Sequence, residues 1–416
     1  MTDKQHDVLI IGAGVIGLCA AHYLLEAGRS VTIVDKGAVG SGASHGNAGY
    51  IAPSHSTPLA SPSSLKEGLR GLLNPASPFY IKPRPDPALW EWLLRFAWAA
   101  RTSQTERNRP VLAALSRLSA DLYDELMAAP ELDCLYERGG LLEAYRDPER
   151  FAHGRDEAAH LQALGLPLRP LDRAATLALV PGLRDDIAGG VLMEADGHLD
   201  PAAFLASMAR WLQARGAVVL TDSAVTGFVR TGRTIEAALT AAGPLTANDY
   251  VLATGSWSPQ LGRELDLRLP IQAAKGYSIT VENPPGSPTL PILLMESRVA
   301  LTPLGDRFRL AGTLEIAGID LSLNATRLQA LRDALPAYFR AWPETATLET
   351  WAGLRPVTPD GLPIIGRAPT SDNLLLAMGH AMLGISLAPA TGKLTAQLLQ
   401  GTIPDLDLTP FRLSRF

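Results

Sequence analysis

The residues with the clearest chemical signature form a glycine turn near the N-terminus. Gly12, Gly14 and Gly17 have the spacing Gly-x-Gly-x-x-Gly, and Asp35 follows 21 residues after Gly14. In such a turn the first glycine allows a tight bend, the second lets backbone N–H groups approach a pyrophosphate, and the third allows close helix–strand packing. A helix N-terminus attracts phosphate, and an acid at this distance accepts hydrogen bonds from a ribose diol. The spacing therefore predicts a dinucleotide site.

The elements around the turn are those that this chemistry requires. Val8–Ile11 is a continuous apolar run, as expected for a strand buried on both faces, and Leu18–Ala27 has a helical pattern. A second apolar run, Val31–Val34, ends at Asp35. A lone glycine motif would be weak evidence, but strand, turn, helix, strand and acid in this order predict a complete βαβ unit.

Further along the chain, the pattern predicts more strands and helices. We expect strands at Val218–Leu220 and Val225–Val229, and together they suit a second strand cluster of the same sheet. The glycine- and proline-rich C-terminal stretch predicts loops until a closing helix begins at Thr391.

The composition excludes several classes of protein. The chain has 416 residues, 47% hydrophobic and 19% charged, so it can bury a large core without disulfides and has room for two or three domains. Its two cysteines, Cys19 and Cys134, exclude a disulfide framework and a cysteine-rich zinc site, and its eight histidines lack metal-ligand spacing. The net charge of −5, with no basic run, argues against nucleic-acid binding.

Two observations bear on the compartment. No apolar stretch of about 18 residues occurs, and Met1–Asp7 lacks the features of a signal peptide, so we expect a cytoplasmic protein. From the composition we expect neither a metal nor a nucleic acid as partner. The segment Pro78–Ala100 holds three of the seven tryptophans. This pattern fits an amphipathic helix packed on the protein, and it also fits a peripheral contact with the inner face of the plasma membrane.

Ordered motifs along almost the whole chain resemble flavin-dependent amine and D-amino-acid oxidoreductases. This group contains D-amino acid oxidase, glycine oxidase and sarcosine oxidase, and the chain looks most like bacterial D-amino acid dehydrogenases. The motifs are GAGVIG, GSGASHGNAGYIAPS (Gly40–Ser54), DGHLDPAAF (Asp196–Phe204), VLATGSWSP (Val251–Pro259), KGYSIT (Lys275–Thr280), AGT (Ala311–Thr313), AGLRPVTPDGLPIIG (Ala352–Gly366) and GHAMLGISLAPATGKL (Gly379–Leu394).

The resemblance implies an α/β fold in which a Rossmann-like FAD-binding domain is interleaved with an α+β substrate domain built on a mixed antiparallel sheet. The expected FAD-binding domain comprises residues 1–75, 190–265 and 350–416, and the substrate domain 76–189 and 266–349. FAD is expected to bind noncovalently. Sarcosine oxidases attach it through a C-terminal cysteine, and this chain has no cysteine after Cys134.

The resemblance also identifies the residues expected to contact FAD. They are Gly12, Ala13, Gly14, Val15, Ile16, Gly17, Asp35, Lys36, Gly42, Ala43, Ser44, Asn47, Ala48, Gly49, Tyr50, Ile51, Val225, Ala253, Thr254, Gly255, Trp257, Gly353, Gly379, His380, Leu383, Gly384, Ile385 and Ser386. Backbone N–H groups near Gly384 and Ile385 are expected to stabilise negative charge on the reduced flavin.

Five residues are candidates for the substrate side. Arg355 matches the position of a carboxylate-binding arginine in glycine oxidase-like relatives, and a guanidinium matches a carboxylate bidentately. Tyr277 and His55 are further candidates for the carboxylate or amine, and His380 fits either an active-site or a structural role. Met382 lies in the segment where glycine oxidase carries another arginine, which favours a more apolar substrate.

The resemblance leaves three functions open. The favoured one is a D-amino acid dehydrogenase that transfers hydride from Cα to N5 of FAD and passes electrons to a quinone or another acceptor. The expected substrates of this dehydrogenase are D-proline or 4-hydroxy-D-proline, and also small apolar D-amino acids. The alternatives are an O2-using oxidase of glycine- or sarcosine-type acids and a non-catalytic flavin-binding subunit. The sequence leaves the oligomeric state open, a homo-oligomer included.

Overall fold

The apolar runs beside the glycine turn form the centre of a six-stranded sheet. The computed structural model describes residues 6–62, 64–66 and 79–416. The sheet has the order β10-β2-β1-β14-β21-β20, and β1 pairs in parallel with both β2 and β14. Its strands are β1 (His6–Ile11), β2 (Val31–Val34), β10 (Val218–Leu220), β14 (Ala247–Leu252), β20 (Ile364–Arg367) and β21 (Leu374–Met378). Only β20, at one edge, runs antiparallel to its neighbour.

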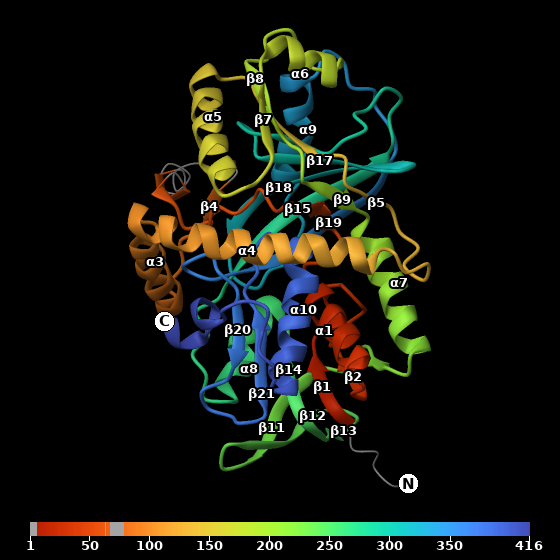
Figure 1. Cartoon of the computed structure of the whole chain (residues 1–416), viewed down its shortest axis with the longest axis vertical. Helices are drawn as coiled ribbons and strands as arrows, with labels where there is room; N and C mark the ends of the chain where they lie inside the picture. Colours follow the sequence, from red (N-terminus) through yellow and green to blue (C-terminus); the bar gives the residue numbers. More distant parts are fainter. Residues whose placement is uncertain (1–5, 63, 67–78) are drawn as a thin grey trace.

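Two helices next to this sheet begin at the residues of the predicted cofactor motifs. Helix α1 (Val15–Glu26) starts directly after Gly14, and α10 (Gly384–Gln400) packs against it. Leu18 and Ala388 lie in one buried apolar cluster with Val251 of β14. Figure 1 shows this sheet and both helices in the lower half of the molecule.

A second, larger sheet carries most of the remaining strands. Its order is β19-β15-β18-β17-β16-β6-β8-β7, with β4 paired to β18. The strands are β4 (Phe79–Ile81), β6 (Leu141–Tyr145), β7 (Leu168–Leu171), β8 (Gly189–Met193), β15 (Gln272–Glu282), β16 (Ile292–Leu294), β17 (Val299–Leu304), β18 (Arg307–Ile316) and β19 (Thr347–Val357). Pairing is antiparallel except between β16 and β6 and between β18 and β4. Helix α9 (Ala325–Tyr338) packs on one face of this sheet.

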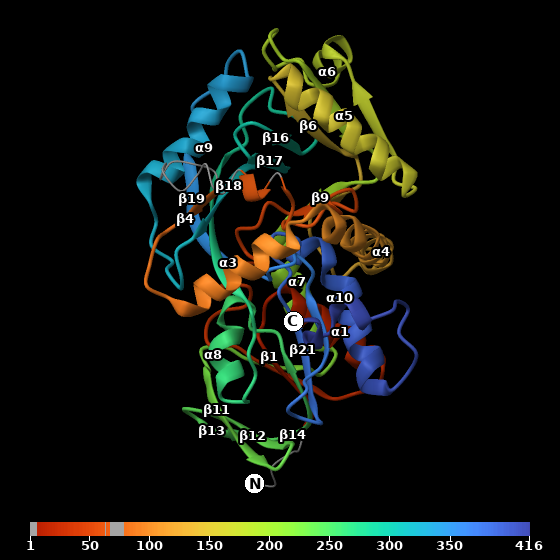
Figure 2. The same cartoon turned by 90° about the vertical axis from the view of Figure 1, so that its left-hand side faces the viewer.

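The other elements connect or cover these two sheets. They are α3 (Pro87–Ala99), α4 (Thr102–Leu126), α5 (Pro148–Ala163), α6 (Arg173–Leu179), α7 (Pro201–Ala214), α8 (Ser258–Arg263), β3 (Tyr50–Ile51), β5 (Tyr136–Glu137), β9 (Gly197–Leu199), β11 (Val225–Thr231), β12 (Thr234–Thr240) and β13 (Gly243–Leu245). Figures 1 and 2 show α4 running between the lower sheet and the upper part of the molecule that contains α5, α6 and α9.

The predicted fold class is confirmed, with four differences in detail. Strand β11 does not join the six-stranded sheet but pairs with β12 in a separate antiparallel sheet, because a hairpin satisfies its backbone locally. The closing helix begins at Gly384 instead of Thr391. Helix α4 was expected in the substrate domain, yet its apolar face packs on α10. Residues 350–357, expected in the FAD-binding domain, complete β19 of the larger sheet.

Four parts of the sequence-based interpretation fall partly outside the described residues. The undescribed residues are 1–5 of the N-terminal segment, 63 and 67–75 of the expected FAD-binding domain, 76–78 of the expected substrate domain, and Pro78 of the tryptophan-rich segment. Among the residues that are described, no helix is both long and apolar enough to span a bilayer.

Candidate cofactor cavity and active site

A cavity of about 600 Å³ opens at the carboxyl ends of β1, β2 and β14. Most of the predicted cofactor residues line it. They are Gly12, Gly14, Val15, Ile16, Asp35, Lys36, Gly42, Ala43, Ser44, Asn47, Val225, Ala253, Thr254, Gly255, Trp257, His380, Gly384 and Ile385. Ligands of parallel α/β sheets bind in this position, beyond the strand ends.

The three glycines of the first turn have different surroundings. A Cβ on Gly12, whose φ is +118°, would lie 2.4 Å from the carbonyl oxygen of Ala253. A Cβ on Gly17 would lie 1.9 Å from the carbonyl oxygen of Gly12. A Cβ on Gly14 would meet within 4 Å, among the described residues other than its chain neighbours, only Oγ of Ser44, at 3.5 Å. Gly12 and Gly17 therefore serve chain packing, whereas Gly14 leaves room for a ligand at the start of α1.

Polar groups of the adjoining loops face the same part of the cavity. Oγ of Ser44 accepts a hydrogen bond from the Val15 backbone N–H, at 3.2 Å. Nζ of Lys36 lies 3.4 Å from the centroid of the Trp257 ring, a cation–π contact. Burial lowers the pKa of Lys36, while the charge of Asp35 acts in the opposite direction. This end of the cavity thus combines an aromatic ring, a cation and an acid.

At the other end, the cavity meets the N-terminus of α10. Gly384 and Ile385 begin this helix, and no side chain in the described part of the chain caps its first turn. Uncapped backbone N–H groups and the helix dipole favour negative charge at this position. His380 also lines the cavity, and its Nε2 lies 2.9 Å from Oγ1 of Thr391 in α10. Burial lowers the pKa of His380 to about 3, so the ring is neutral at physiological pH.

Ten of the predicted cofactor residues do not line the cavity. They are Ala13, Gly17, Ala48, Gly49, Tyr50, Ile51, Gly353, Gly379, Leu383 and Ser386. Several form hydrogen bonds next to the lining segments. Oγ of Ser386 donates a 2.7 Å hydrogen bond to the carbonyl of Tyr50, and the carbonyl of Ala48 accepts one from Thr302 of the larger sheet, also at 2.7 Å.

Arg355 lies on the face of the larger sheet that meets the Gly40–Gly49 loop, called the cofactor-binding loop below. Side chains alternate along a strand, so Trp351, Gly353 and Arg355 share one face of β19. The Trp351 ring packs against Gly46, where a Cβ would come within 2.2 Å of it. Burial lowers the pKa of Arg355 to about 10, so the side chain remains protonated at neutral pH. No acidic side chain of the described residues forms an ion pair with Arg355.

Tyr277 is not brought to this face, which corrects the expectation that it faces the substrate. It pairs with Ala352, so it points to the opposite side of the sheet, into the apolar cluster under α9. Its hydroxyl donates a 2.9 Å hydrogen bond to Oε2 of Glu315, which also forms an ion pair with Arg327. Burial raises the pKa of Tyr277 well above its usual value.

His55 and Met382 do not line the cavity either. Nε2 of His55 is buried 3.9 Å from Oε1 of Glu143, and burial together with the charge of Arg298 lowers its pKa to about 4. Met382 is 44% exposed. Its apolar side chain is not part of the cavity lining, and its place on the substrate side stays a prediction.

Sequence reasoning missed a further set of lining residues. They are Ile11, Val34, Ser41, Ala224, Thr226, Ser256, Gln260, Leu261, Arg263, Glu264, Leu354, Pro356, Ala377, Met378 and Ala381. The signal was present for Leu354 and Pro356, which flank Arg355 in its motif. For the residues of α8, such as Arg263, no local pattern indicates a ligand, because only the tertiary structure brings them to the cavity.

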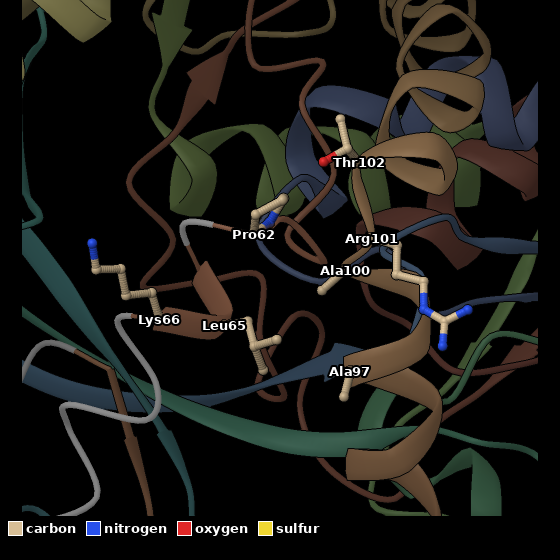
Figure 3. A pocket seen from close by; sticks show the side chains of 7 residues that line it. All are labelled: Pro62, Leu65, Lys66, Ala97, Ala100, Arg101 and Thr102. Atoms are coloured by element: carbon tan, nitrogen blue, oxygen red, sulfur yellow. The ribbon is translucent and has the colours of Figure 1, made fainter.

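A shallower cavity of about 690 Å³ lies near the C-terminal end of α3, apart from the first. Figure 3 shows the seven side chains that line it, with Lys66 and Arg101 among small or apolar ones. Nothing in the lining residues resembles the first cavity: the part of the lining that is described has no glycine turn, acid or aromatic ring.

Comparison with known proteins agrees with this geometry. The profile of the family described as FAD dependent oxidoreductase matches residues 7–398. D-amino acid dehydrogenases of Bradyrhizobium diazoefficiens and Paramagnetospirillum magneticum are 33% and 35% identical to the chain, in each case over 98% of both sequences.

Solved structures show the same fold. Glycine oxidase from Geobacillus kaustophilus superposes with a TM-score of 0.79 at 24% identity, over 99% of both chains. L-proline dehydrogenase from P. horikoshii gives a TM-score of 0.79 at 20% identity, over 100% of this chain and 98% of the other.

Proposed function

Because the chain belongs to the family of FAD dependent oxidoreductases and FAD is its cofactor, we propose that it is a D-amino acid dehydrogenase. The bound flavin supplies the acceptor for the hydride that leaves Cα of the substrate. The protein binds the cofactor, anchors the substrate and excludes water. Full-length relatives that carry the name D-amino acid dehydrogenase support this assignment over the two alternatives.

The residues of the cavity fit FAD bound without a covalent link. The N-terminus of α1 beside Gly14 would hold the pyrophosphate, and Asp35 would accept hydrogen bonds from the ribose. The uncapped N-terminus of α10 would stabilise negative charge at the flavin end. Both cysteines, Cys19 and Cys134, lie away from the cavity lining, which supports noncovalent binding.

The single observation that carries the substrate assignment is Arg355. It is a half-buried cation without an acidic partner among the described residues, on the face of the sheet that meets the Gly40–Gly49 loop. Burying a charge in this way is costly unless a counter-ion arrives. A substrate carboxylate would supply that counter-ion and would bind the guanidinium through charge-assisted hydrogen bonds. We therefore propose α-amino acids, with D-proline-type acids among them, as substrates.

Anaerobic reduction of the bound flavin by a panel of D- and L-amino acids tests this function. The panel includes D-alanine, D-proline, 4-hydroxy-D-proline, glycine and sarcosine. We expect rapid bleaching by D-amino acids, and loss of at least about 100-fold in kcat/KM in Arg355→Met, because a charge-assisted carboxylate contact is removed. Arg340→Met, which removes a half-exposed arginine on the surface, is the matched control. Bleaching of Arg355→Met at the wild-type rate would contradict the assignment.

The identity of the electron acceptor is a separate part of the proposal. A dehydrogenase passes its electrons to a quinone or another acceptor and releases little hydrogen peroxide, whereas an oxidase releases peroxide as fast as it turns over. We expect dye and quinone reduction to exceed peroxide release. Peroxide release that matches dye reduction would favour the oxidase alternative.

The outer face of α3 supports a peripheral contact with a membrane. Trp92 and Phe96 are buried and stacked, as the packed-helix interpretation expects. Trp90, Leu94 and Trp98, spaced four residues apart, are 58%, 75% and 53% exposed. Tryptophan and leucine on one face of a helix, beside cations, are typical of interfacial helices.

Cations lie next to this stripe. Arg101 lies over the Trp98 ring, with its guanidinium carbon 5.9 Å from the ring centroid, and Lys66 lies across the cavity of Figure 3. We expect the protein to sediment with vesicles of anionic lipid and the double variant Trp90→Ser/Trp98→Ser to stay in the supernatant. Ile403→Ser, which removes an exposed apolar residue elsewhere, is the control. Equal sedimentation of all three proteins would contradict the contact.

A further inference from the structure

A β-bulge lies beside Arg355. Strand β18 carries one residue more than β15 at this point, so that Thr313 and Leu314 both lie opposite Gly276. Bulges of this kind re-aim backbone groups and are frequent next to active sites. The AGT motif that ends at Thr313 has no role in the site described so far.

The backbone at Thr313 is strained. Its φ is +60°, in the left-handed region that β-branched residues rarely adopt. The side chain does not explain this conformation, since Oγ1 is buried without a hydrogen-bond partner among the described residues and Thr313 is only 9% exposed. The carbonyl does give a reason, because it accepts a 2.5 Å hydrogen bond from Nη1 of Arg355. Such a strained backbone persists only where the surrounding structure holds it in place, and it is frequent at functional sites.

Gly276, on the other strand of the bulge, leaves space for the guanidinium of Arg355 because it has no side chain. A Cβ on Gly276 would lie 2.2 Å from Cζ and Nη1 of Arg355 and 2.3 Å from Nη2. The backbone of Gly276 has no positive φ, so its conformation alone does not require glycine. The requirement comes from the guanidinium that lies against it.

We propose that Thr313 and Gly276 are positioning residues for Arg355. The Thr313 carbonyl holds one arm of the guanidinium, and Gly276 is the surface on which its plane lies. The remaining N–H groups are then left in a fixed orientation for the substrate carboxylate. This inference rests on the proposed function, in which Arg355 binds that carboxylate.

Gly276→Ala tests the inference directly. The three atoms nearest to the new methyl group all belong to the guanidinium, the far end of a flexible side chain, so the protein should fold and bind FAD while Arg355 is displaced. We expect KM for the amino acid and Kd for benzoate, read from the flavin absorption spectrum, to rise about tenfold, because a charge-assisted contact is weakened. The melting temperature and the FAD content should stay at wild-type values. Gly227→Ala, in β11, is the matched control.

Two further variants separate the outcomes. The first is the double variant Arg355→Met/Gly276→Ala, in which the new methyl group meets no guanidinium. It should bind benzoate as weakly as Arg355→Met alone. Thr313→Gly relieves the backbone strain, so we expect a higher melting temperature. The backbone at this position is then no longer fixed, the carbonyl holds Arg355 less firmly, and we therefore also expect a higher KM.

Wild-type KM and benzoate affinity in Gly276→Ala and Thr313→Gly, with loss in Arg355→Met, would overturn the inference and leave the proposed function standing. Wild-type substrate binding in Arg355→Met would instead overturn the anchor of the proposed function. If Gly276→Ala fails to fold, Thr313→Gly decides alone.

Discussion

The backbone N–H of Ala13 donates a 2.7 Å hydrogen bond to Oδ2 of Asp35, which joins the glycine turn to the acid at the end of β2. Oδ1 of the same carboxylate accepts a second bond, from the Gly37 backbone N–H at 3.0 Å. The acid that was predicted to meet the ribose is therefore also the residue that holds the turn in place. Its orientation is fixed before any ligand binds.

Asp35→Asn should weaken FAD binding by about 10- to 100-fold. The amide nitrogen cannot accept a hydrogen bond, so one of the two backbone donors loses its partner, and the charge that favours the ribose hydroxyls is lost. Quenching of flavin fluorescence on titration of the apoprotein measures the effect. Asp249→Asn, which removes a surface acid paired with Arg29, is the control. Less than a twofold change in Kd for Asp35→Asn would contradict this role.

Gly14→Ala and Gly17→Ala should fail in different ways. The methyl group of Gly14→Ala meets only Oγ of Ser44, at 3.5 Å, so the protein should fold and lose affinity for FAD. The methyl group of Gly17→Ala would overlap the Gly12 carbonyl, which should cost at least about 3 kcal/mol of folding free energy. Urea denaturation and FAD titration of both variants check the contrast. Equal loss of stability in the two proteins would refute it.

His380 should affect stability more than the pH dependence of catalysis. Its pKa of about 3 means that the ring is neutral throughout pH 5–9. His380→Leu removes the partner of the Thr391 hydroxyl and should destabilise the protein by about 1–3 kcal/mol, and His380→Gln should recover part of this loss. The shape of the pH profile of kcat/KM should be the same in all three proteins. A titration near pH 6 that disappears in either variant would show that His380 ionises during the reaction.

Asp196 should make the protein less stable as the pH rises. Burial raises the pKa of this carboxyl to about 7, and the charge of Glu143 acts in the same direction. Between pH 4 and 7 the unfolded chain is ionised at Asp196 while the folded protein is still protonated. The stabilisation is thus complete below pH 4 and is lost as the pH passes 7.

Asp196→Asn tests this sign. Oδ1 of Asp196 accepts a hydrogen bond from the Ser54 backbone at 3.1 Å, and the asparagine oxygen can keep it. The variant should gain stability over wild type at pH 8, on the order of 4 kcal/mol at most, and the difference should vanish by pH 4. Melting curves at both pH values measure it, with Glu194→Gln, an exposed acid in a surface ion pair, as control. A pH-independent difference would mean that Asp196 is ionised in the folded protein.

Local patterns predicted the cofactor half of the site better than the substrate half. The turn, the acid, the Gly40–Gly49 loop and the Ala253–Gly255 turn are each contiguous in sequence, and each contributes residues to the cavity lining. Their conformations depend mainly on neighbours within a few residues, and glycine marks the positions that require close approach.

The substrate half depends on strand register, which no local pattern contains. Whether Tyr277 or Gly276 faces the cofactor-binding loop is decided by a single-residue shift, because successive side chains point to opposite faces of a sheet. The pairing of β15 with β19 places Gly276 beside Arg355 and turns Tyr277 toward α9. The packing of α4 on α10 is likewise a contact between segments far apart in the chain.

The sequence by itself therefore determined the α/β class, the dinucleotide turn with its acid and the presence of an arginine suited to a carboxylate. The first two follow from the types and spacing of nearby residues, whereas Arg355 was identified by its resemblance to a carboxylate-binding arginine of glycine oxidase-like relatives. Only the tertiary structure decided which face of the larger sheet meets the cofactor-binding loop, and that Thr313, 42 residues before Arg355, holds its guanidinium. Such contacts arise when distant strands pair, and the pairing is set by the burial of whole sheet faces and not by any short segment.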